Sequence, residues 1–254
     1  MLQTPTHALP WLDAPSGQCV QFPPVAQAWA QGDPMPGLLA GGGNLEPQSL
    51  RAAYAQGIFP WFSQGQPILW WSPDPRMTLH VSNFKLHPSL RKTLAKFIRN
   101  HDCEIRIDHD FAGVIAQCAQ TPRAGQGGTW IVHDMQAAYT ALHHAGAAHS
   151  VETWIDGVLA GGLYCTALGA AVFGESMFSH QADASKIALA ALVALCRAQG
   201  VGLIDCQQNT AHLASLGAQE MPRSAFCAHV AQAVQASPLH WRFEPIYWQH
   251  LHSF

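Results

Sequence analysis

The sequence predicts an α+β fold in which a small N-terminal unit packs on a larger sheet domain. From about residue 82 onward, helical patterns alternate with a central meander of strand patterns. The first 80 residues are instead rich in Pro, Gly and Trp, as expected of a smaller packed unit. Hydrophobic residues make up 48% of the 254 positions and charged residues only 11%, which favours a large core over disorder. We therefore expect domains over 1–80 and 81–254.

The N-terminal unit is predicted to hold little regular structure. Residues 1–37 are rich in Pro and Gly, and LLAGGGNL at 38–45 has the composition of a turn. A helix is expected over 46–57, because a proline falls in its first turn and a glycine at its end. The next twenty residues, GIFPWFSQGQPILWWSPDPR, contain four Pro and cannot form a regular helix. Short strands are expected within and after this stretch, at 68–71 and 77–81.

The larger domain is predicted from alternating helical and strand patterns. The dipeptide Asp156-Gly157, between two apolar runs, is a strong signal for a β-hairpin. We expect helices at 87–100, 111–120, 134–145, 185–199, 212–216 and 224–236. We expect strands at 104–107, 129–132, 150–155, 158–168, 170–178 and 203–207.

Composition and motifs argue against several classes of protein. The net charge of −3 does not mark a general nucleic-acid binder. The seven Cys are odd in number and form no CxxC pair, so a reducing cytoplasm is expected rather than a disulfide framework. The longest apolar run, 187–196, is too short to span a membrane, and the N-terminus lacks the pattern of a secretory signal. The 15 His form no HExxH or Cys/His knuckle, so no metal is predicted.

The stretch FGESMFSHQADASK, at 173–186, places an acid inside an apolar strand. Because side chains two apart share a face, Phe173, Glu175 and Met177 are expected on one face, either in the core or on a pocket wall. A carboxylate there needs a cationic or N–H partner. The alternative is a residue at a hairpin edge that points to water. A helix follows at once, as a crossover would require.

Two further groups of residues are candidates for a site. Asp205 and Gln207 lie two apart at the C-terminal end of a strand, so both are expected to point the same way, although a capping Asp and a surface Gln would give the same pattern. Trp61 and Trp130 lie beside Pro or Gly rather than on periodic core positions. Such indoles either stack on nucleobases or pack between domains.

Basic residues are concentrated in one segment. Lys85, Arg91, Lys92, Lys96 and Arg99 are five of the 13 Lys and Arg residues and fall within fifteen positions. On a helix, the last three lie at i, i+4 and i+7 and form one stripe. A stripe of this kind either tracks nucleic-acid phosphates or is simply a solvated helix face.

Six stretches together resemble one family. They are LLAGGGNLEPQSLRAAYAQGIFPWF, PILWWSPDPR, GGTWI, AHSVETW, FGESMFS with ASK after it, and LIDCQ with HLASLGA. In this order, over about 37–226, they resemble leucyl/phenylalanyl-tRNA–protein transferases. The resemblance implies a small N-terminal domain and an N-acetyltransferase-like (GNAT-like) domain with a mostly antiparallel sheet. It implies an enzyme that transfers Leu, Phe or Met from aminoacyl-tRNA to the N-terminal Arg or Lys of proteins. This transfer marks the proteins for N-end rule degradation. The enzyme is expected to be a cytoplasmic monomer that uses no cofactor.

The resemblance also implies roles for individual residues. Trp61 and Trp130 match tryptophans that contact the terminal adenosine of the tRNA, and Glu175 matches a pocket glutamate. Asp205 and Gln207 match the proposed catalytic pair. The pocket for the amino-acid side chain is implied at Phe173, Leu163, Met177, Leu189, Leu192 and Ile204, and the stripe at Lys85, Arg91, Lys92, Lys96 and Arg99 is expected to bind tRNA.

Because an aminoacyl ester is already activated, we expect direct aminolysis without an acyl-enzyme. Gln207 would orient the attacking amine, and Asp205 would fix Gln207, help to take the proton or attract the cationic acceptor. One rival is a CoA-dependent N-acyltransferase on the same fold, but the loop SHQADAS before the helix lacks the glycines that pyrophosphate binding needs. Another is a non-catalytic tRNA or peptide-binding module, which would not need Asp205 and Gln207.

Overall fold

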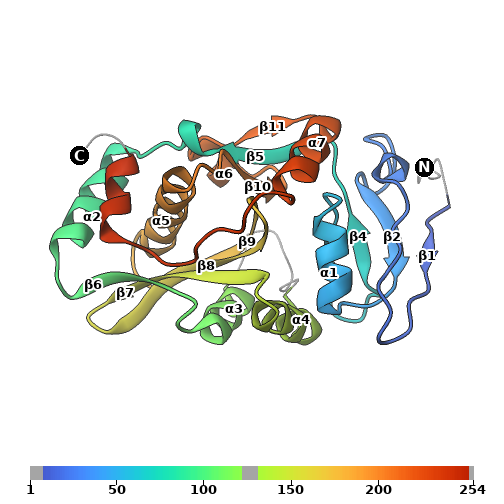
Figure 1. Ribbon diagram of the computed structural model, residues 1–254, viewed down its shortest axis with the longest axis horizontal. Helices are drawn as coiled ribbons and strands as arrows, with labels where there is room; N and C mark the ends of the chain where they lie inside the picture. The colour runs from blue at the N-terminus through green and yellow to red at the C-terminus, as the bar shows by residue number, and fades with distance from the viewer. Residues whose placement is uncertain (1–7, 122–130, 252–254) are drawn as a thin grey trace.

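The computed structural model describes residues 8–121 and 131–251 and contains two sheets (Figure 1). The smaller sheet has the strand order β1-β2-β4-β3. Its strands are β1 (Trp11–Leu12), β2 (Leu38–Gly42), β3 (Phe59–Pro60) and β4 (Leu69–Trp71).

The larger sheet has the strand order β11-β5-β10-β9-β8-β7-β6. Its neighbours are antiparallel except β9 and β10, which run parallel and are joined by a helical crossover. The fold is therefore mixed α/β with mostly antiparallel sheets. The strands are β5 (Arg76–His80), β6 (Cys103–Ile107), β7 (Ala148–Ile155), β8 (Val158–Leu168), β9 (Ala171–Ser179), β10 (Leu203–Gln207) and β11 (Gln219–Met221).

Helices cover both faces of the larger sheet (Figure 1). One face carries α2 (Pro88–Arg99), the crossover helix α5 (Ala184–Ala198) and the 3₁₀ helix η3 (Pro245–Leu251). The other carries α3 (Phe111–Gln120) and α4 (His133–His144). Helix α1 (Pro47–Tyr54) joins the smaller sheet to α4. The remaining helical segments are α6 (Ala211–Ser215), α7 (Arg223–Ala233), η1 (Val25–Gln27) and η2 (Val81–Asn83).

Local sequence signals account for several of these elements. Helix α1 has a proline at its first position, and Gly57 follows it with a φ of +74°, a conformation that glycine adopts without strain. Asp156 and Gly157 both have positive φ, as the predicted tight hairpin between β7 and β8 requires. The apolar run at 187–196 lies inside α5 and is buried in the core. Of the described helices, none has the length and apolar character needed to cross a membrane.

Two predictions of local structure are wrong. The stretch at 38–45, expected to be a turn, begins with strand β2, and only its glycines Gly42 and Gly43, both with positive φ, turn the chain. The strand expected at 129–132 is absent from its described part, Ile131 and Val132. Val132 has an extended backbone, but it is the N-cap of α4 and belongs to no sheet. The short strands β1, β3 and β11 and the helix η3 were not predicted.

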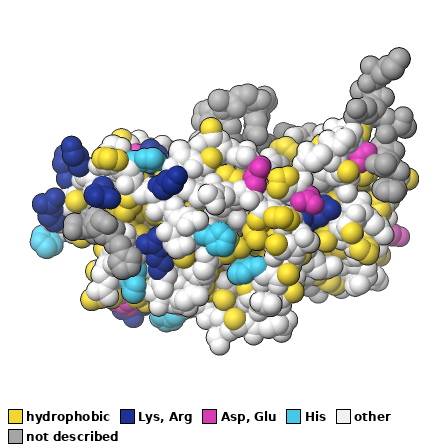
Figure 2. Space-filling model, turned by 90° about the horizontal axis from the view of Figure 1, so that it is seen from above, with side chains coloured by type: hydrophobic (Ala, Val, Ile, Leu, Met, Phe, Trp, Pro, Cys, Tyr) yellow, Lys and Arg dark blue, Asp and Glu magenta, His cyan; other side chains and the backbone are white. Residues whose placement is uncertain are grey.

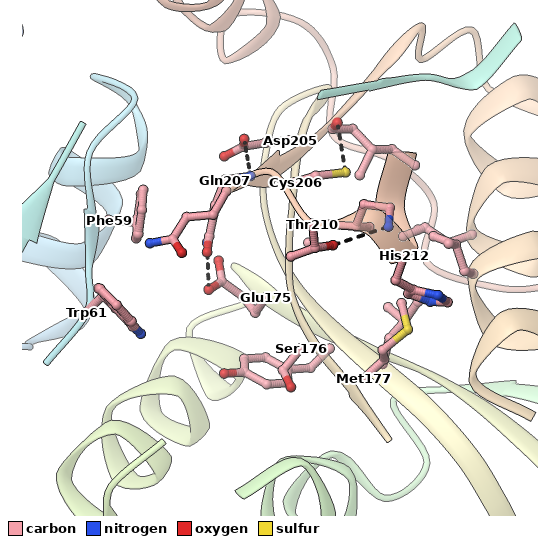
Figure 3. Close-up of a pocket in the computed structure, with 18 residues that line it drawn as sticks. Phe59, Trp61, Glu175, Ser176, Met177, Asp205, Cys206, Gln207, Thr210 and His212 are labelled. Carbon is pink, nitrogen blue, oxygen red and sulfur yellow. Dashed lines mark hydrogen bonds between the residues drawn. The ribbon is translucent and has the colours of Figure 1, made fainter. Parts of the chain in front are cut away.

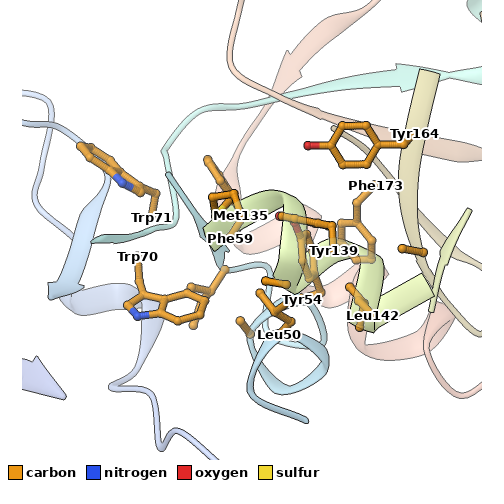
Figure 4. Close-up of a cluster of buried hydrophobic side chains, with 14 of the residues drawn as sticks. Leu50, Tyr54, Phe59, Trp70, Trp71, Met135, Tyr139, Leu142, Tyr164 and Phe173 are labelled. Atoms are coloured by element: carbon orange, nitrogen blue, oxygen red, sulfur yellow. The ribbon is translucent and has the colours of Figure 1, made fainter. Parts of the chain in front are cut away.

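A continuous apolar cluster joins the two sheets (Figure 4). Trp70 and Trp71 are buried in it, so packing accounts for both of these tryptophans. The cluster fixes the smaller sheet, and the chain that leads to Trp61, against the larger one. Its members drawn in Figure 4 include Leu50, Tyr54, Phe59, Trp70 and Trp71 from the first 80 residues, and Met135, Tyr139, Leu142, Tyr164 and Phe173 from the rest.

Two β-bulges interrupt the larger sheet near its middle. On β9 the register with β8 shifts around Glu175, and on β10 the register with β5 shifts between Asp205 and Gln207. Because the shift on β9 breaks the alternation of side chains, Phe173 and Met177 pack in different apolar clusters, on opposite faces of the sheet. The prediction that Phe173, Glu175 and Met177 share one face is therefore wrong.

Candidate functional site

A pocket of about 680 Å³ opens where β9 and β10 meet the segment that carries β3. Phe59 and Trp61 lie on one side, Met177 and His212 lie on the other, and Glu175 lies between them (Figure 3). One end of the pocket is therefore aromatic, the other is aliphatic, and polar groups lie at its centre. The aliphatic end is formed by Leu163, Met177, Leu189, Leu192, Ile204 and Leu213.

Glu175 is the centre of the polar part. The hydroxyl of Tyr54, from α1, donates a hydrogen bond to its Oε1 at 2.6 Å, and Nε2 of Gln207, from β10, donates to its Oε2 at 3.0 Å. The hydroxyl of Tyr139, from α4, lies 3.4 Å from Oε2 and also contacts the hydroxyl of Tyr54. Three elements thus converge on this carboxylate of β9, which the sequence alone left without an identified partner.

The pKa of Glu175 is raised from its ordinary value of 4.5 to about 7. Burial is the largest cause, because it disfavours the charged form, and the negative charge of Asp205 adds to it. The hydrogen bonds from Tyr54, Gln207 and Tyr139 oppose this rise because they stabilise the anion. Glu175 therefore exchanges a proton in the range in which peptide amines also titrate.

Asp205 is paired with a cation inside the protein. Nε and Nη2 of Arg76, on β5, donate to its Oδ1 and Oδ2 at 2.8 and 2.6 Å, and both side chains are 1% exposed. The Arg76 guanidinium lies over the rings of Phe59 and Phe226, 4.7 and 4.6 Å from their centroids. Because Arg76 neutralises this carboxylate, the expectation that Asp205 attracts a cationic acceptor is not supported.

The side chains of Asp205 and Gln207 diverge, contrary to the prediction that they point the same way. Asp205 reaches Arg76 on β5, whereas Gln207 reaches Glu175 on β9, and these strands flank β10 on opposite sides. Gln207 has a φ of +61°, in the left-handed region that favours glycine. Its backbone N–H donates to Oδ1 of Asp205 at 2.9 Å, which stabilises this turn. The bulge thus directs the Gln207 amide into the pocket.

Cys206 lies between these two residues and also lines the pocket. Burial raises the pKa of its thiol well above the ordinary value, and the charge of Asp205 raises it further. The thiol is therefore protonated at neutral pH and is a poor nucleophile. Among residues 8–121 and 131–251, no group of three His, Cys, Asp or Glu side chains is gathered as a metal ion would require.

Most residues predicted for the site come together at this pocket. Phe173 does not line it, because the β9 bulge turns its side chain into the core against the ring of Tyr54, with ring centroids 5.0 Å apart. Trp130 lies outside the described residues. The predicted residues that line the pocket are Trp61, Leu163, Glu175, Met177, Leu189, Leu192, Ile204, Asp205 and Gln207.

Three partners of Glu175 and Asp205 were missed from the sequence. Arg76 closes the motif SPDPR, whose prolines suggested only irregular chain, while Tyr54 and Tyr139 lie on helices where their rings look like ordinary core residues. A buried-acid argument applied to Asp205 could have identified the need for a cationic or N–H partner, as it did for Glu175.

None of the five basic residues lines the pocket; four of them lie on α2, and Lys85 lies just before it. Lys85, Arg91, Lys92, Lys96 and Arg99 are all exposed, and dark blue side chains gather at the end of the molecule where α2 lies (Figure 2). In the described parts of the chain, the ion pairs within 4.0 Å include none of these five residues. Their charges therefore face the solvent.

The pocket brings a titratable carboxylate and an amide together beside an apolar cavity in a mixed α/β fold, an arrangement suited to an enzyme active site. The model of the family "Leucyl/phenylalanyl-tRNA protein transferase" matches residues 78–231, and that of its N-terminal domain matches 43–74. The chain therefore belongs to the leucyl/phenylalanyl-tRNA protein transferase family, as its motifs predicted.

Individual relatives agree with this assignment. Proteins named leucyl/phenylalanyl-tRNA–protein transferase from Polaromonas sp. and Albidiferax ferrireducens are 60% and 58% identical over 243 residues, 96% of this chain and 94% of each relative. That from Methylibium petroleiphilum is 58% identical over 242 residues, 95% of this chain and 90% of the relative. A crystal structure of a functionally unknown conserved protein from Staphylococcus epidermidis is only weakly similar: the match covers 73% of this chain and 68% of that chain, with a TM-score of 0.34 and 8% identity.

Proposed function

We propose that this chain transfers Leu, Phe or Met from aminoacyl-tRNA to the N-terminal Arg or Lys of proteins, which marks them for degradation by the N-end rule pathway. Family membership supports this proposal. The observation that carries it is the pocket, which places an aliphatic wall, a half-buried indole and the pair Glu175 and Gln207 around one cavity.

The pocket has suitable walls for each part of an aminoacyl-adenosine end. The aliphatic end accepts an apolar side chain without a branch at Cβ, such as that of Leu, Phe or Met, and it discriminates by only about 1–3 kcal/mol per methylene, which suits a set of similar amino acids. Trp61 offers an indole face on which the terminal adenine stacks, for about 1–3 kcal/mol. Trp130 is proposed for the same role. The exposed stripe on α2 then follows phosphates of the tRNA.

The reaction is a direct aminolysis. The N-terminal amine of the acceptor attacks the ester carbonyl carbon, the bond from that carbon to the ribose oxygen breaks, and the amine proton ends on the ribose hydroxyl. Because Nε2 of Gln207 donates to Glu175, Oε1 of Gln207 remains to accept an amine N–H. Such an amine has a pKa of about 7.7–8, so a fraction is already neutral and positioning supplies much of the acceleration.

Glu175 is the group proposed to bind the α-amino group of the aminoacyl end and to relay the proton. Its pKa of about 7 lies close to that of the amines, which is favourable for proton transfer in both directions. Asp205 is not proposed as the base, because both of its carboxylate oxygens accept hydrogen bonds from Arg76.

No acyl-enzyme is proposed, because the thiol of Cys206, which lines the pocket, is held protonated. Replacing Cys206 by Ala is expected to leave transfer within about threefold of the wild type. Isolation of an aminoacyl thioester on Cys206 from a rapidly quenched reaction would contradict the one-step mechanism.

The larger domain is proposed to be GNAT-like. The parallel pair β9 and β10 with its crossover helix supports this assignment. The chain before α5 lacks a glycine-rich phosphate loop, so acetyl-CoA is not expected to be a donor. We also propose a division into domains near residue 80 and a monomer in the bacterial cytoplasm. The seven cysteines, all free in the structure, suit a reducing compartment.

The test uses purified protein, radiolabelled Leu-tRNA or Phe-tRNA, and a peptide with an N-terminal Arg. Label is expected in the peptide. The matched control peptide has the same sequence with an acetylated N-terminus, which removes the nucleophile, and it should stay unlabelled. Absence of label from the free peptide, or equal label in both peptides, would refute the proposed reaction.

A further inference from the structure

Arg76 is a buried cation that the reaction described above does not use. Its side chain is fully enclosed, and three of its nitrogen atoms donate hydrogen bonds: two to Asp205 and one, from Nη1, to the carbonyl oxygen of Gly57 at 3.2 Å. The guanidinium is also held between the rings of Phe59 and Phe226. The planar guanidinium group of Arg76 therefore has a fixed orientation, which the ammonium group of a lysine would not provide.

The residues that contact Arg76 are linked to both the polar part and the aromatic part of the pocket. The oxygen of Asp205 that accepts from Nε of Arg76 also accepts the backbone N–H of Gln207, which adopts the left-handed conformation. On the other side, Phe59 lies two residues before Trp61, and both line the pocket. Arg76 therefore directly contacts Asp205, which supports the Gln207 turn, and its ring partner Phe59 forms part of the pocket wall.

We propose that Arg76 is a positioning residue, which clamps Asp205 so that the Gln207 turn holds its amide against Glu175 in the pocket. The inference rests on the proposed transfer reaction and deepens it. Asp205 then serves as a fixed anion rather than as a proton acceptor. Without the guanidinium of Arg76, the Asp205 side chain is free to rotate. The left-handed turn at Gln207 then loses its support, and the side-chain amide of Gln207 moves away from the reacting amine.

The experiment replaces Arg76 by Lys in the full chain and measures transfer at saturating and limiting aminoacyl-tRNA. Because a misplacement of about 1 Å reduces a rate by about 100-fold, kcat per folded molecule is expected to fall by about that factor. The KM for aminoacyl-tRNA should stay within about threefold, because the aliphatic wall is unchanged. The matched control is Arg223→Lys, at a partly buried arginine that donates to the carbonyl oxygen of Ser72, and it should keep the wild-type kcat.

A second variant protects the test against misfolding. Arg76→Met combined with Asp205→Asn removes both buried charges, so no unpaired ion is left in the core. This double variant is expected to fold and still to show a kcat reduced by about 100-fold. Circular dichroism and gel filtration give the folded fraction of each variant.

The possible outcomes separate this inference from the proposed function. A wild-type chain without transfer would overturn both. An active wild type, together with Arg76→Lys or the double variant within about threefold of its kcat per folded molecule, would overturn the positioning role alone. A fall in activity that merely follows the loss of folded protein would also overturn it, because it would assign Arg76 to stability only.

Discussion

Replacing Glu175 by Gln tests the electrostatics of the pocket most directly. The substitution keeps the size of the side chain and removes its charge. In the folded chain the pKa of Glu175 is raised from 4.5 to about 7 because the carboxylate is buried. The difference corresponds to about 3 kcal/mol, which the folded state loses when Glu175 ionises.

The sign follows from where the proton is held. Between pH 4.5 and about 7 the folded chain keeps the Glu175 proton while the unfolded chain has lost it, so this contribution to stability falls as pH rises through that window. This contribution to stability is fully present below pH 4.5 and is lost above about pH 7. The Gln variant has no such dependence. Its stability relative to the wild type should therefore rise by about 3 kcal/mol on going from low to high pH.

Urea unfolding of both chains at about pH 5 and about pH 8, followed by tryptophan fluorescence, measures this difference. The control is Glu46→Gln. The pKa of Glu46 is lowered from 4.5, chiefly by the backbone N–H of Gly17, so that variant should lose nearly the same stability at both pH values, because this contribution fades only below pH 4.5. If Glu175→Gln gave the same change at both pH values, or a larger gain at pH 5, the buried-carboxylate reasoning would be wrong.

The same variant has an expected effect on transfer. Wild-type activity should rise with pH through about 7 as Glu175 ionises, whereas the Gln variant should show a flat profile in that range and a rate lower by about 100-fold. A more stable and less active protein is the combination that this site predicts. A variant with unchanged activity would remove Glu175 from the mechanism.

Three further predictions concern the surroundings of the pocket. Trp61→Ala should raise the KM for aminoacyl-tRNA by about 10-fold, the loss of one stacked base, with a smaller change in kcat; an unchanged KM would argue against stacking. Tyr54→Phe removes a hydrogen bond that lowers the pKa of Glu175, so the acid limb of the pH–rate profile should move to higher pH. Replacing Lys92, Lys96 and Arg99 together by Gln should reduce the salt dependence of tRNA binding, and an identical salt slope would show that α2 does not contact phosphates.

The elements that were well predicted from the sequence are those specified by local chemistry. The hairpin at Asp156-Gly157 needs two residues that tolerate positive φ, and both are present there. Helices α3 and α5 have strong apolar patterns and were predicted almost to the residue. Strand β2 was missed because its glycines suggest a turn, whereas its place is set by pairing with β4, about 30 positions away.

The site could be predicted only in part, for a related reason. Its motif residues were identified by resemblance, but their partners are distant in the chain. Arg76 and Asp205 are 129 positions apart, and Tyr54 and Glu175 are 121 apart. No periodicity within one segment indicates such pairs. Only the requirement that a buried charge be matched points to a partner, and it does not say which residue the partner is.

The two bulges explain why the pocket lies at this position. The ladder between the parallel strands β9 and β10 consists of two pairs, Ile204 with Val172 and Asp205 with Phe173. A Cβ added at Gly174, the next residue on β9, would lie 3.3 Å from the carbonyl oxygen of Asp205, so the absence of a side chain there allows the close approach of β10. Each strand then leaves regular register, and the next inward-facing groups are Glu175 and Gln207. A regular continuation would have placed these positions by simple alternation, as the sequence pattern suggested. Because the irregularity occurs on both strands at the same level, the polar pair meets at the end of an apolar wall, which is the geometry that the proposed mechanism uses.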